Sequence, residues 1–294
     1  MHILGILLAL GAGLFFGIIG PITKTAYNLG VGVSLAIFLR YLVATLLILP
    51  AIPFQKKLIS VYINNFFYFI LITLGSILLT IGLLVSVTFI DVSLAILIFC
   101  TYPIFVLLLS IIIDKEKISS VVKLLFLSTF IGLFFVLGPS FDDLNLFGVI
   151  LASIAAIGGT TMITTNQRMV KKGITPIQIN IFVNIFNFIF FSFVLFFFFT
   201  INFSISKIAL FTILIPSISY AIALFFQLLA IPKIGQSNTA LFLYSEPVIA
   251  IIGAVLLLKE TLNYYQLLGA IVVLMSLALA IYLTGKSKML LHKV

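Results

Sequence analysis

Two charged side chains, Arg40 and Glu246, stand inside long apolar stretches of the sequence. An ionised group at membrane depth costs at least about 2.5 to 3.5 kcal/mol, so a charge at such a position is a candidate for function. A guanidinium can hold a carboxylate through two parallel hydrogen bonds, and a carboxylate can balance an ammonium group or bind a proton. The pair therefore predicts a site for a small zwitterion such as an amino acid, with protons as a candidate coupling ion. The alternatives are that Arg40 extends to the membrane surface and that the two charges satisfy one another.

Aligned polar side chains add a surface to these two charges. Residues separated by three, four or seven positions share one face of a helix. Three asparagines with this spacing are predicted to line a wet cavity: Asn180, Asn184 and Asn187. Tyr220 and Gln227 share a second face and are further candidates for contact with a substrate. For a third set, Thr73, Ser76 and Thr80, hydrogen bonding between helices is the preferred interpretation.

The groups that enzymes commonly use for catalysis are scarce. The chain contains one cysteine, Cys100, and two histidines, His2 and His292, close to its two ends. Cysteine metal clusters and internal disulfides are therefore excluded, imidazole-based catalysis nearly so, and we predict no catalytic residue, metal site or cofactor. A polytopic enzyme of lipid or prenyl metabolism is the alternative function. Such enzymes typically need clustered carboxylates, whereas the adjacent Asp142 and Asp143 fall in a predicted loop.

The composition places these residues in a membrane. Of 294 residues, 63% are hydrophobic and only 8% are charged, whereas charged residues make up roughly a quarter of globular chains. About 20 apolar residues cross a hydrocarbon core of about 30 Å. We therefore predict an all-α integral membrane protein with ten transmembrane helices. The predicted spans are 3–22, 33–53, 65–89, 92–113, 119–137, 146–165, 177–200, 207–231, 237–258 and 263–283.

The distribution of basic residues predicts the orientation of these spans, because Lys and Arg accumulate on the cytoplasmic side of a membrane. Twelve of the 16 basic residues fall on the side of the two termini, three fall on the other side, and Arg40 lies within a span. Both termini are therefore predicted to be cytoplasmic. Basic residues scattered singly or in pairs also argue against a nucleic-acid partner, despite the net charge of +9.

The sequence repeats at a distance of 144 residues. This shift matches Pro103 with Pro247, Lys115–Glu116 with Lys259–Glu260, and Tyr102 with Glu246. Each half has five spans, and an odd number inverts the second copy in the membrane, as in many secondary transporters. We expect a first repeat at 1–140 and a second at 141–294 that ends in a short cytoplasmic tail. Tyr102 is a candidate site residue because it occupies the position of Glu246, whereas Glu116 and Glu260 are expected to be fold or gating elements at the water boundary.

Small residues and prolines are the candidate moving parts. Gly13 and Gly17 form a G-x-x-x-G pattern in the first span, and small residues let helices approach closely and slide. Pro103 and Pro247 fall inside the fourth and ninth spans, where each removes a backbone hydrogen bond and favours a kink. Kinks at repeat-matched positions predict gates.

These patterns resemble a known family, the EamA-like branch of the drug/metabolite transporter superfamily, over residues 3–137 and 146–284. The resemblance rests on the two-copy layout, on Phe38-Leu39-Arg40, on Glu246-Pro247, and on Glu116 or Glu260 before a glycine-containing helix. It implies a carrier of small organic solutes in a bacterial inner membrane, often an exporter of amino acids or related metabolites. It also implies a central cavity formed by spans one to four and six to nine. One departure is Phe16-Gly17, where family members commonly have Trp-Gly.

The leading expectation is a secondary transporter that works by alternating access and exports amino acids or related amphiphilic solutes. A channel is disfavoured, because the chain has neither a loop that resembles a selectivity filter nor a ring of charges. The expected partners are membrane lipids, a small-molecule substrate and protons, with the chain acting as a monomer or a homodimer.

Overall fold

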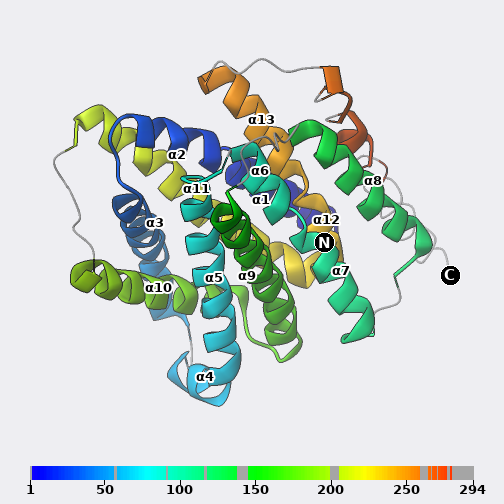
Figure 1. Ribbon diagram of the computed structural model, residues 1–294. Helices are drawn as coiled ribbons and strands as arrows, with labels where there is room; N and C mark the ends of the chain where they lie inside the picture. The colour runs from blue at the N-terminus through cyan, green and yellow to red at the C-terminus, as the bar shows by residue number, and fades with distance from the viewer. Residues whose placement is uncertain are drawn as a thin grey trace.

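The computed structural model describes most of the chain, and the elements of this part are helices (Figure 1). The described residues are 2–55, 58–90, 92–115, 118–137, 145–198, 205–258, 264–265, 267–269, 271–276 and 279. The first half contains α1 (His2–Gly17), α2 (Ile19–Asn28), α3 (Val33–Ile48), η1 (Leu49–Phe54), α4 (Leu58–Asn64), α5 (Phe66–Ser86), α6 (Val92–Phe99), α7 (Tyr102–Ile112) and α8 (Ser120–Leu137). The second half contains α9 (Leu146–Lys171), α10 (Pro176–Phe198), α11 (Lys207–Ile234), α12 (Gln236–Phe242) and α13 (Ser245–Leu258).

Most of these helices can cross a membrane. Seven segments of the described chain are long and apolar enough, namely Ile3–Asn28, Val33–Phe54, Phe66–Ser86, Leu146–Lys171, Pro176–Phe197, Lys207–Ile234 and Gln236–Leu257. Three shorter apolar helices are Tyr102–Ile112, Ser120–Phe135 and Leu267–Ser276. The protein is therefore an all-helical, multi-pass membrane protein. Glu116, Glu260 and the predicted cytoplasmic tail lie outside the described residues.

The fourth and ninth predicted spans are interrupted. The chain forms turns at Cys100–Thr101, between α6 and α7, and at Leu243–Tyr244, between α12 and α13. Proline lacks a backbone N–H and is tolerated in the first turn of a helix, and Pro103 and Pro247 lie in the first turns of α7 and α13. The kinks expected at the two prolines thus take the form of helix breaks at nearly equivalent positions of the two halves.

The first span is longer than the sequence indicated. The helix continues past residue 22 through α2 to Asn28, with only a local irregularity at Ile18. A lysine ended the predicted span early, because hydropathy alone treats a single charge as a boundary. Lys24 therefore lies on a helix and not in a loop, which changes what its side chain can reach.

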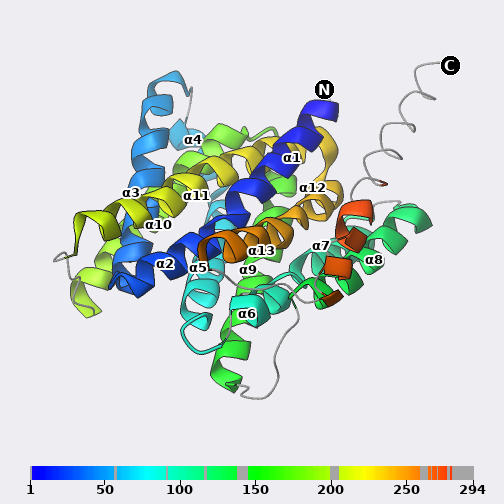
Figure 2. The same cartoon turned by 90° about the horizontal axis from the view of Figure 1, so that it is seen from above.

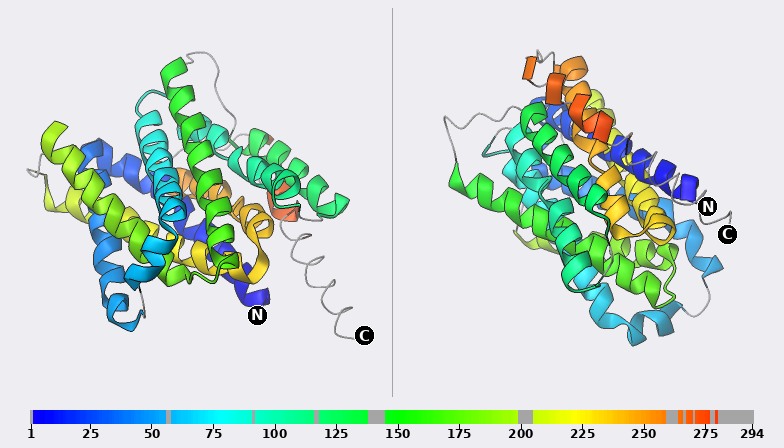
Figure 3. Two further views of the ribbon diagram at one scale, coloured as in Figure 1. Left: turned by 90° about the horizontal axis from the view of Figure 1, so that it is seen from below. Right: turned by 90° about the vertical axis from the view of Figure 1, so that its right-hand side faces the viewer.

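The two halves pair in an exchanged pattern (Figures 1 and 3). Helix α5 of the first half packs against α9, which begins the second half. Helix α11 of the second half packs against α1, which begins the first half. The α5 and α9 backbones touch, since a Cβ added to Gly75 would lie 2.9 Å from the carbonyl oxygen of Gly158. The helices α3 and α10 pack together on one side of the bundle, and α8 lies on the opposite side (Figure 2).

The two largest clusters of buried side chains meet near the middle of the bundle. One includes Phe126, Tyr244 and Tyr102, and the other includes Tyr41 and Tyr220. Members of both clusters line a single cavity, so the cavity lies where the two parts of the core meet.

Candidate functional site

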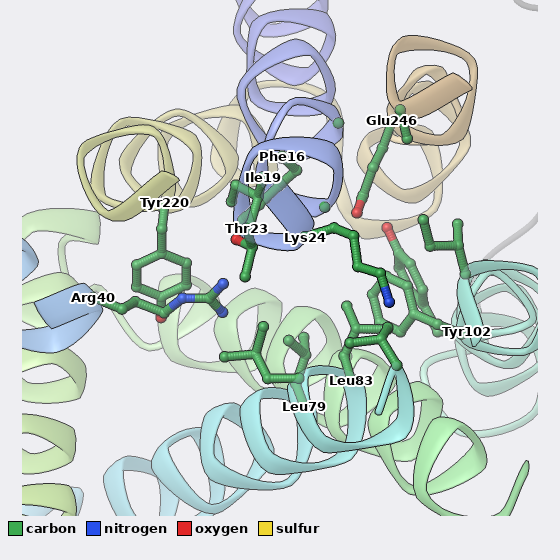
Figure 4. A pocket seen from close by; sticks show the side chains of 18 of the residues that line it. Phe16, Ile19, Thr23, Lys24, Arg40, Leu79, Leu83, Tyr102, Tyr220 and Glu246 are labelled. Carbon is green, nitrogen blue, oxygen red and sulfur yellow. The ribbon is translucent and has the colours of Figure 1, made fainter. Parts of the chain in front are cut away.

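A cavity inside the bundle brings many of the candidate residues together (Figure 4). Its empty space is about 940 Å³, which includes space open to solvent. Most of the wall is apolar, with Phe16, Leu79, Leu83, Ile96 and Phe99 among its members. The polar and charged lining residues are Thr23, Lys24, Tyr27, Arg40, Tyr102, Tyr220, Gln227 and Glu246.

The cavity reaches from the middle of the bundle toward one end. Glu246 is packed against Gly17, near the middle of the span Ile3–Asn28. Lys24 and Tyr27 lie in the last turns of the same span and also line the cavity, and we name this the Lys24 end of the molecule. The start of the span lies at the opposite end, where Gly5 is packed against Ile234.

The Arg40 side chain, on α3, packs against an aromatic ring. Its side chain is only 6% exposed, and its guanidinium carbon lies 4.9 Å from the centre of the Tyr220 ring. This distance is within the range of a cation–π interaction, which stabilises a desolvated cation without neutralising it. Arg40 does not form an ion pair with Glu246 in this structure. Among the described residues, the ion pair is the one between Arg168 and Asp114.

Glu246 is held against the first helix by two glycines. A Cβ on Gly17 would lie 2.5 Å from the carbonyl oxygen of Glu246, and a Cβ on Gly13 would overlap the side chain of the preceding residue, Ser245. The two glycines of the G-x-x-x-G pattern thus let α13 approach α1, as small residues do in membranes. The Glu246 side chain points into the cavity toward Tyr102 (Figure 4).

The repeat relates Tyr102 to Glu246 in space as well as in sequence. Gly159 on α9 faces Tyr102, whose ring carbon would lie 3.4 Å from an added Cβ, as Gly17 on α1 faces Glu246. The helices that begin after the two breaks, α7 and α13, therefore each pack their first turn against a glycine of the other half. One half presents a phenol to the cavity and the other presents a carboxylate.

Sequence reasoning missed Lys24. The predicted spans 3–22 and 33–53 leave Lys24 in the loop between them, but α2 carries it beside the cavity, where its ammonium group points inward (Figure 4). The helical spacing of neighbouring residues could have indicated this position. Four residues that line the cavity are separated by four, three and four positions, namely Phe16, Gly20, Thr23 and Tyr27. Lys24 follows directly on that face.

The three asparagines do not line this cavity. They are at most 2% exposed, and Asn184 and Asn187 take part in hydrogen bonds to neighbouring helices. The Asn187 amide donates to the Ser76 hydroxyl over 2.8 Å, and the Thr45 hydroxyl donates to the backbone oxygen of Asn184 over 3.1 Å. The Asn184 amide donates within α10 to the backbone oxygen of Asn180 over 3.0 Å.

This polar cluster touches the cavity through two tyrosines. The Tyr41 hydroxyl is hydrogen-bonded to Ser76 over 3.1 Å and to Thr80 over 2.5 Å. Its ring packs edge-on against Tyr220, with centroids 5.5 Å apart. The asparagine face therefore supports Tyr220, and through it Arg40, from behind. The hydroxyls of Ser76 and Thr80 join helices, as the sequence suggested.

A second polar cluster joins helices at the opposite end of the molecule. Arg168 on α9 forms an ion pair with Asp114 at 3.4 Å, and the Gln236 amide donates to Asp114 and to Ser110, each over 2.9 Å. The Ser237 hydroxyl donates to Ser110 over 2.9 Å. We name these five residues the Asp114 cluster. It ties α7 of the first half to α9 and α12 of the second half.

Comparison with known proteins gives the wider context. A solved chain described as "Crystal structure of protein" superposes with a TM-score of 0.79 at 12% identity, over 97% of this chain and 99% of that one, so the two share a fold. A search of curated proteins finds no significant match. The model of the EamA-like transporter family matches residues 3–138 and again residues 146–282. Two matches that together span nearly the whole sequence leave one assignment: the chain belongs to the EamA-like transporter family.

Proposed function

We propose that this protein is a secondary transporter that moves small organic metabolites across a bacterial inner membrane by alternating access. One observation carries the proposal. A cavity with unpaired charges reaches from the middle of the bundle to the Lys24 end, while the Asp114 cluster joins the two halves at the other end. A site near mid-depth that is accessible from one side is what alternating access requires.

We propose that the chain crosses the membrane ten times in two inverted repeats. Seven long and three short apolar helices among the described residues support this count, and the pairing of α5 with α9 and of α1 with α11 supports the repeat. Reporter fusions after residues 57, 172 and 288 should indicate cytoplasm, and one after Asp143 should indicate the exterior. A cytoplasmic signal at Asp143 would remove the inverted-repeat argument.

The membrane orientation proposed from the basic residues indicates toward which side of the membrane the cavity opens. We infer that the Asp114 cluster faces the cytoplasm, because its own Arg168 and the nearby Lys172 and Lys233 lie at the ends of α9 and α11. The Lys24 end then faces outward. We infer from this orientation that the structure corresponds to an outward-facing state, in which the Asp114 cluster blocks the cytoplasmic path.

The cavity suits a small amphiphilic solute such as an amino acid. Arg40 provides a planar fork for a carboxylate, Glu246 provides a counter-charge for an ammonium group, and the apolar walls contact the body of the solute. Glu246 can also exchange a proton with either side as the cavity alternates. We propose that the entry of protons drives export of the solute.

Counterflow separates this function from its rivals. Purified protein in liposomes preloaded with an unlabelled amino acid mixture should accelerate entry of a labelled member of that mixture, because a carrier returns faster when loaded. A pore gives no acceleration. Equal entry into loaded and empty liposomes would contradict the transporter proposal.

A further inference from the structure

The lining of the cavity contains more positive than negative charge. Among the described residues that line it, Lys24 and Arg40 are cations and Glu246 is the carboxylate. A zwitterion placed between Arg40 and Glu246 leaves one lysine without a partner. Lys24 therefore bears on which solute the proposed transporter accepts.

The unmatched lysine matters most when the cavity is occluded. Alternating access excludes bulk water from the site, and a desolvated charge is strongly unfavourable unless an opposite charge pairs with it. In the outward-facing state Lys24 is partly exposed at the mouth, so water can still solvate it. In an occluded state the solute has to supply the missing negative charge.

The geometry favours two separate anionic groups on the solute. Arg40 enters the cavity from α3, beside Tyr220, whereas Lys24 enters from α2 on the side of Tyr102 and Glu246 (Figure 4). Leu79 and Leu83 line the wall between them. A solute that meets both cations thus has an anionic group at each end and an aliphatic middle, and its ammonium group lies near Glu246.

Building on the proposed transport function, we infer that Lys24 is a specificity-determining residue and that the site prefers solutes with two carboxylates over their neutral amides. Acidic amino acids have this chemistry. Lys24 binds the second carboxylate, and its flexible stem lets it follow the solute as the mouth closes.

Two pairs of solutes test the inference, because the members of each pair differ in charge and hardly in shape: glutamate with glutamine, and aspartate with asparagine. Binding to purified protein and counterflow in liposomes are measured for all four. We expect the wild-type protein to prefer the acid over the amide by about tenfold or more, the effect of one hydrogen bond to a charged group. Lys24→Gln should remove this preference by weakening only the acids, and Lys24→Arg should restore it.

Lys207 provides the matched control. It is an exposed lysine at the start of α11, outside the cavity lining, so Lys207→Gln should leave the acid-to-amide ratio unchanged. Equal binding of acid and amide by the wild-type protein would overturn the inference, as would a Lys24→Gln protein that weakens both members equally, the result expected if Lys24 serves only to pair with Glu246. Counterflow of the amides or of leucine without acid preference would leave the transporter proposal standing while the inference fails.

Discussion

Polar side chains are bonded to one another at the Asp114 end of the molecule, whereas those at the Lys24 end face a cavity. At the Asp114 end, a cation, a carboxylate, an amide and two hydroxyls are joined by contacts of 2.9 to 3.4 Å. At the Lys24 end, two cations and a carboxylate face the same cavity, and no ion pair joins them among the described residues.

This difference separates a closing contact from a binding site. Polar groups that bond to each other hold helices together, and among the described residues of the Asp114 cluster only Gln236 Oε1 is a buried side-chain atom without a hydrogen-bond partner. Polar groups without partners are destabilising in an apolar surrounding, so they are kept where water or a solute supplies the partner. The two ends are thus expected to respond differently to the same kind of substitution.

The largest effect is expected from Glu246 at the inner limit of the cavity. Glu246→Gln keeps the shape of the side chain but cannot exchange a proton, so flux driven by a pH gradient should be abolished while exchange of solute continues. Both are measured in the same proteoliposomes, and exchange serves as the control for folding. Full pH-driven flux in a well-folded Glu246→Gln protein would end the proton-coupling proposal.

Arg40 should give the next largest effect. Arg40→Lys and Arg40→Gln both lose the planar fork, and Arg40→Gln also loses the cation that lies 4.9 Å from the centre of the Tyr220 ring. A charged hydrogen bond contributes roughly 1.5 to 3 kcal/mol, so we expect solute affinity to fall by about tenfold or more in both variants. Unchanged uptake by both, with an unchanged melting temperature, would make Arg40 a structural residue.

Gly17 tests whether the cavity depends on close helix contact. A Cβ there would lie 2.5 Å from the backbone oxygen of Glu246 and 2.6 Å from the Cβ of Ile249. We expect Gly17→Ala to destabilise the protein by roughly 1 to 3 kcal/mol, as overpacking does, and to slow transport. Gly32→Ala is the control, since an added Cβ meets nothing within 4 Å and φ is −76°. Equal melting temperatures of the two variants would contradict the close-contact interpretation.

The Asp114 cluster should give the smallest effect. The Arg168 side chain is 29% exposed, and ion pairs near water contribute about 1 kcal/mol or less. Arg168→Gln should therefore shift the population toward the inward-facing state by a few fold at most, measured as spin-label distances between exposed positions Ile112 and Lys172. Lys123→Gln, an exposed change on α8, should leave the distances unchanged. A wild-type distance distribution in Arg168→Gln would show that the cluster does not control opening.

Much of the fold follows from hydropathy and from the repeat. Apolar runs predict helices in a membrane because unsatisfied backbone groups are too costly there. The boundaries of α5, α9 and α11 agree with the predicted spans to within a few residues, except that α9 continues past the predicted end at residue 165 to Lys171. The breaks before Pro103 and Pro247 could be anticipated from the chemistry of proline. The short helix α4 was not predicted, because its seven residues leave no periodic pattern to detect.

The site is less visible in the sequence than the fold. Arg40 and Glu246 stand out because a charge in an apolar run has few harmless interpretations, and both line the cavity. The asparagine face of α10 has the same helical periodicity whether it meets water or another helix. Which of the two it meets depends on α3 and α5 as neighbours, and that information lies in distant parts of the chain. The sequence did not identify Lys24 as a site residue, because a single charge was interpreted as the end of a helix.

The contact between Gly75 and Gly158 has a mechanical consequence. Two rods that touch backbone to backbone near their midpoints have a fulcrum there, with equal lever arms on either side. A small tilt of α5 against α9 displaces both helix ends in opposite directions by comparable amounts, so widening one end narrows the other. The nearest neighbour of the Gly75 position is the backbone oxygen of Gly158, so the pivot is formed mainly by backbone atoms, which cannot change rotamer.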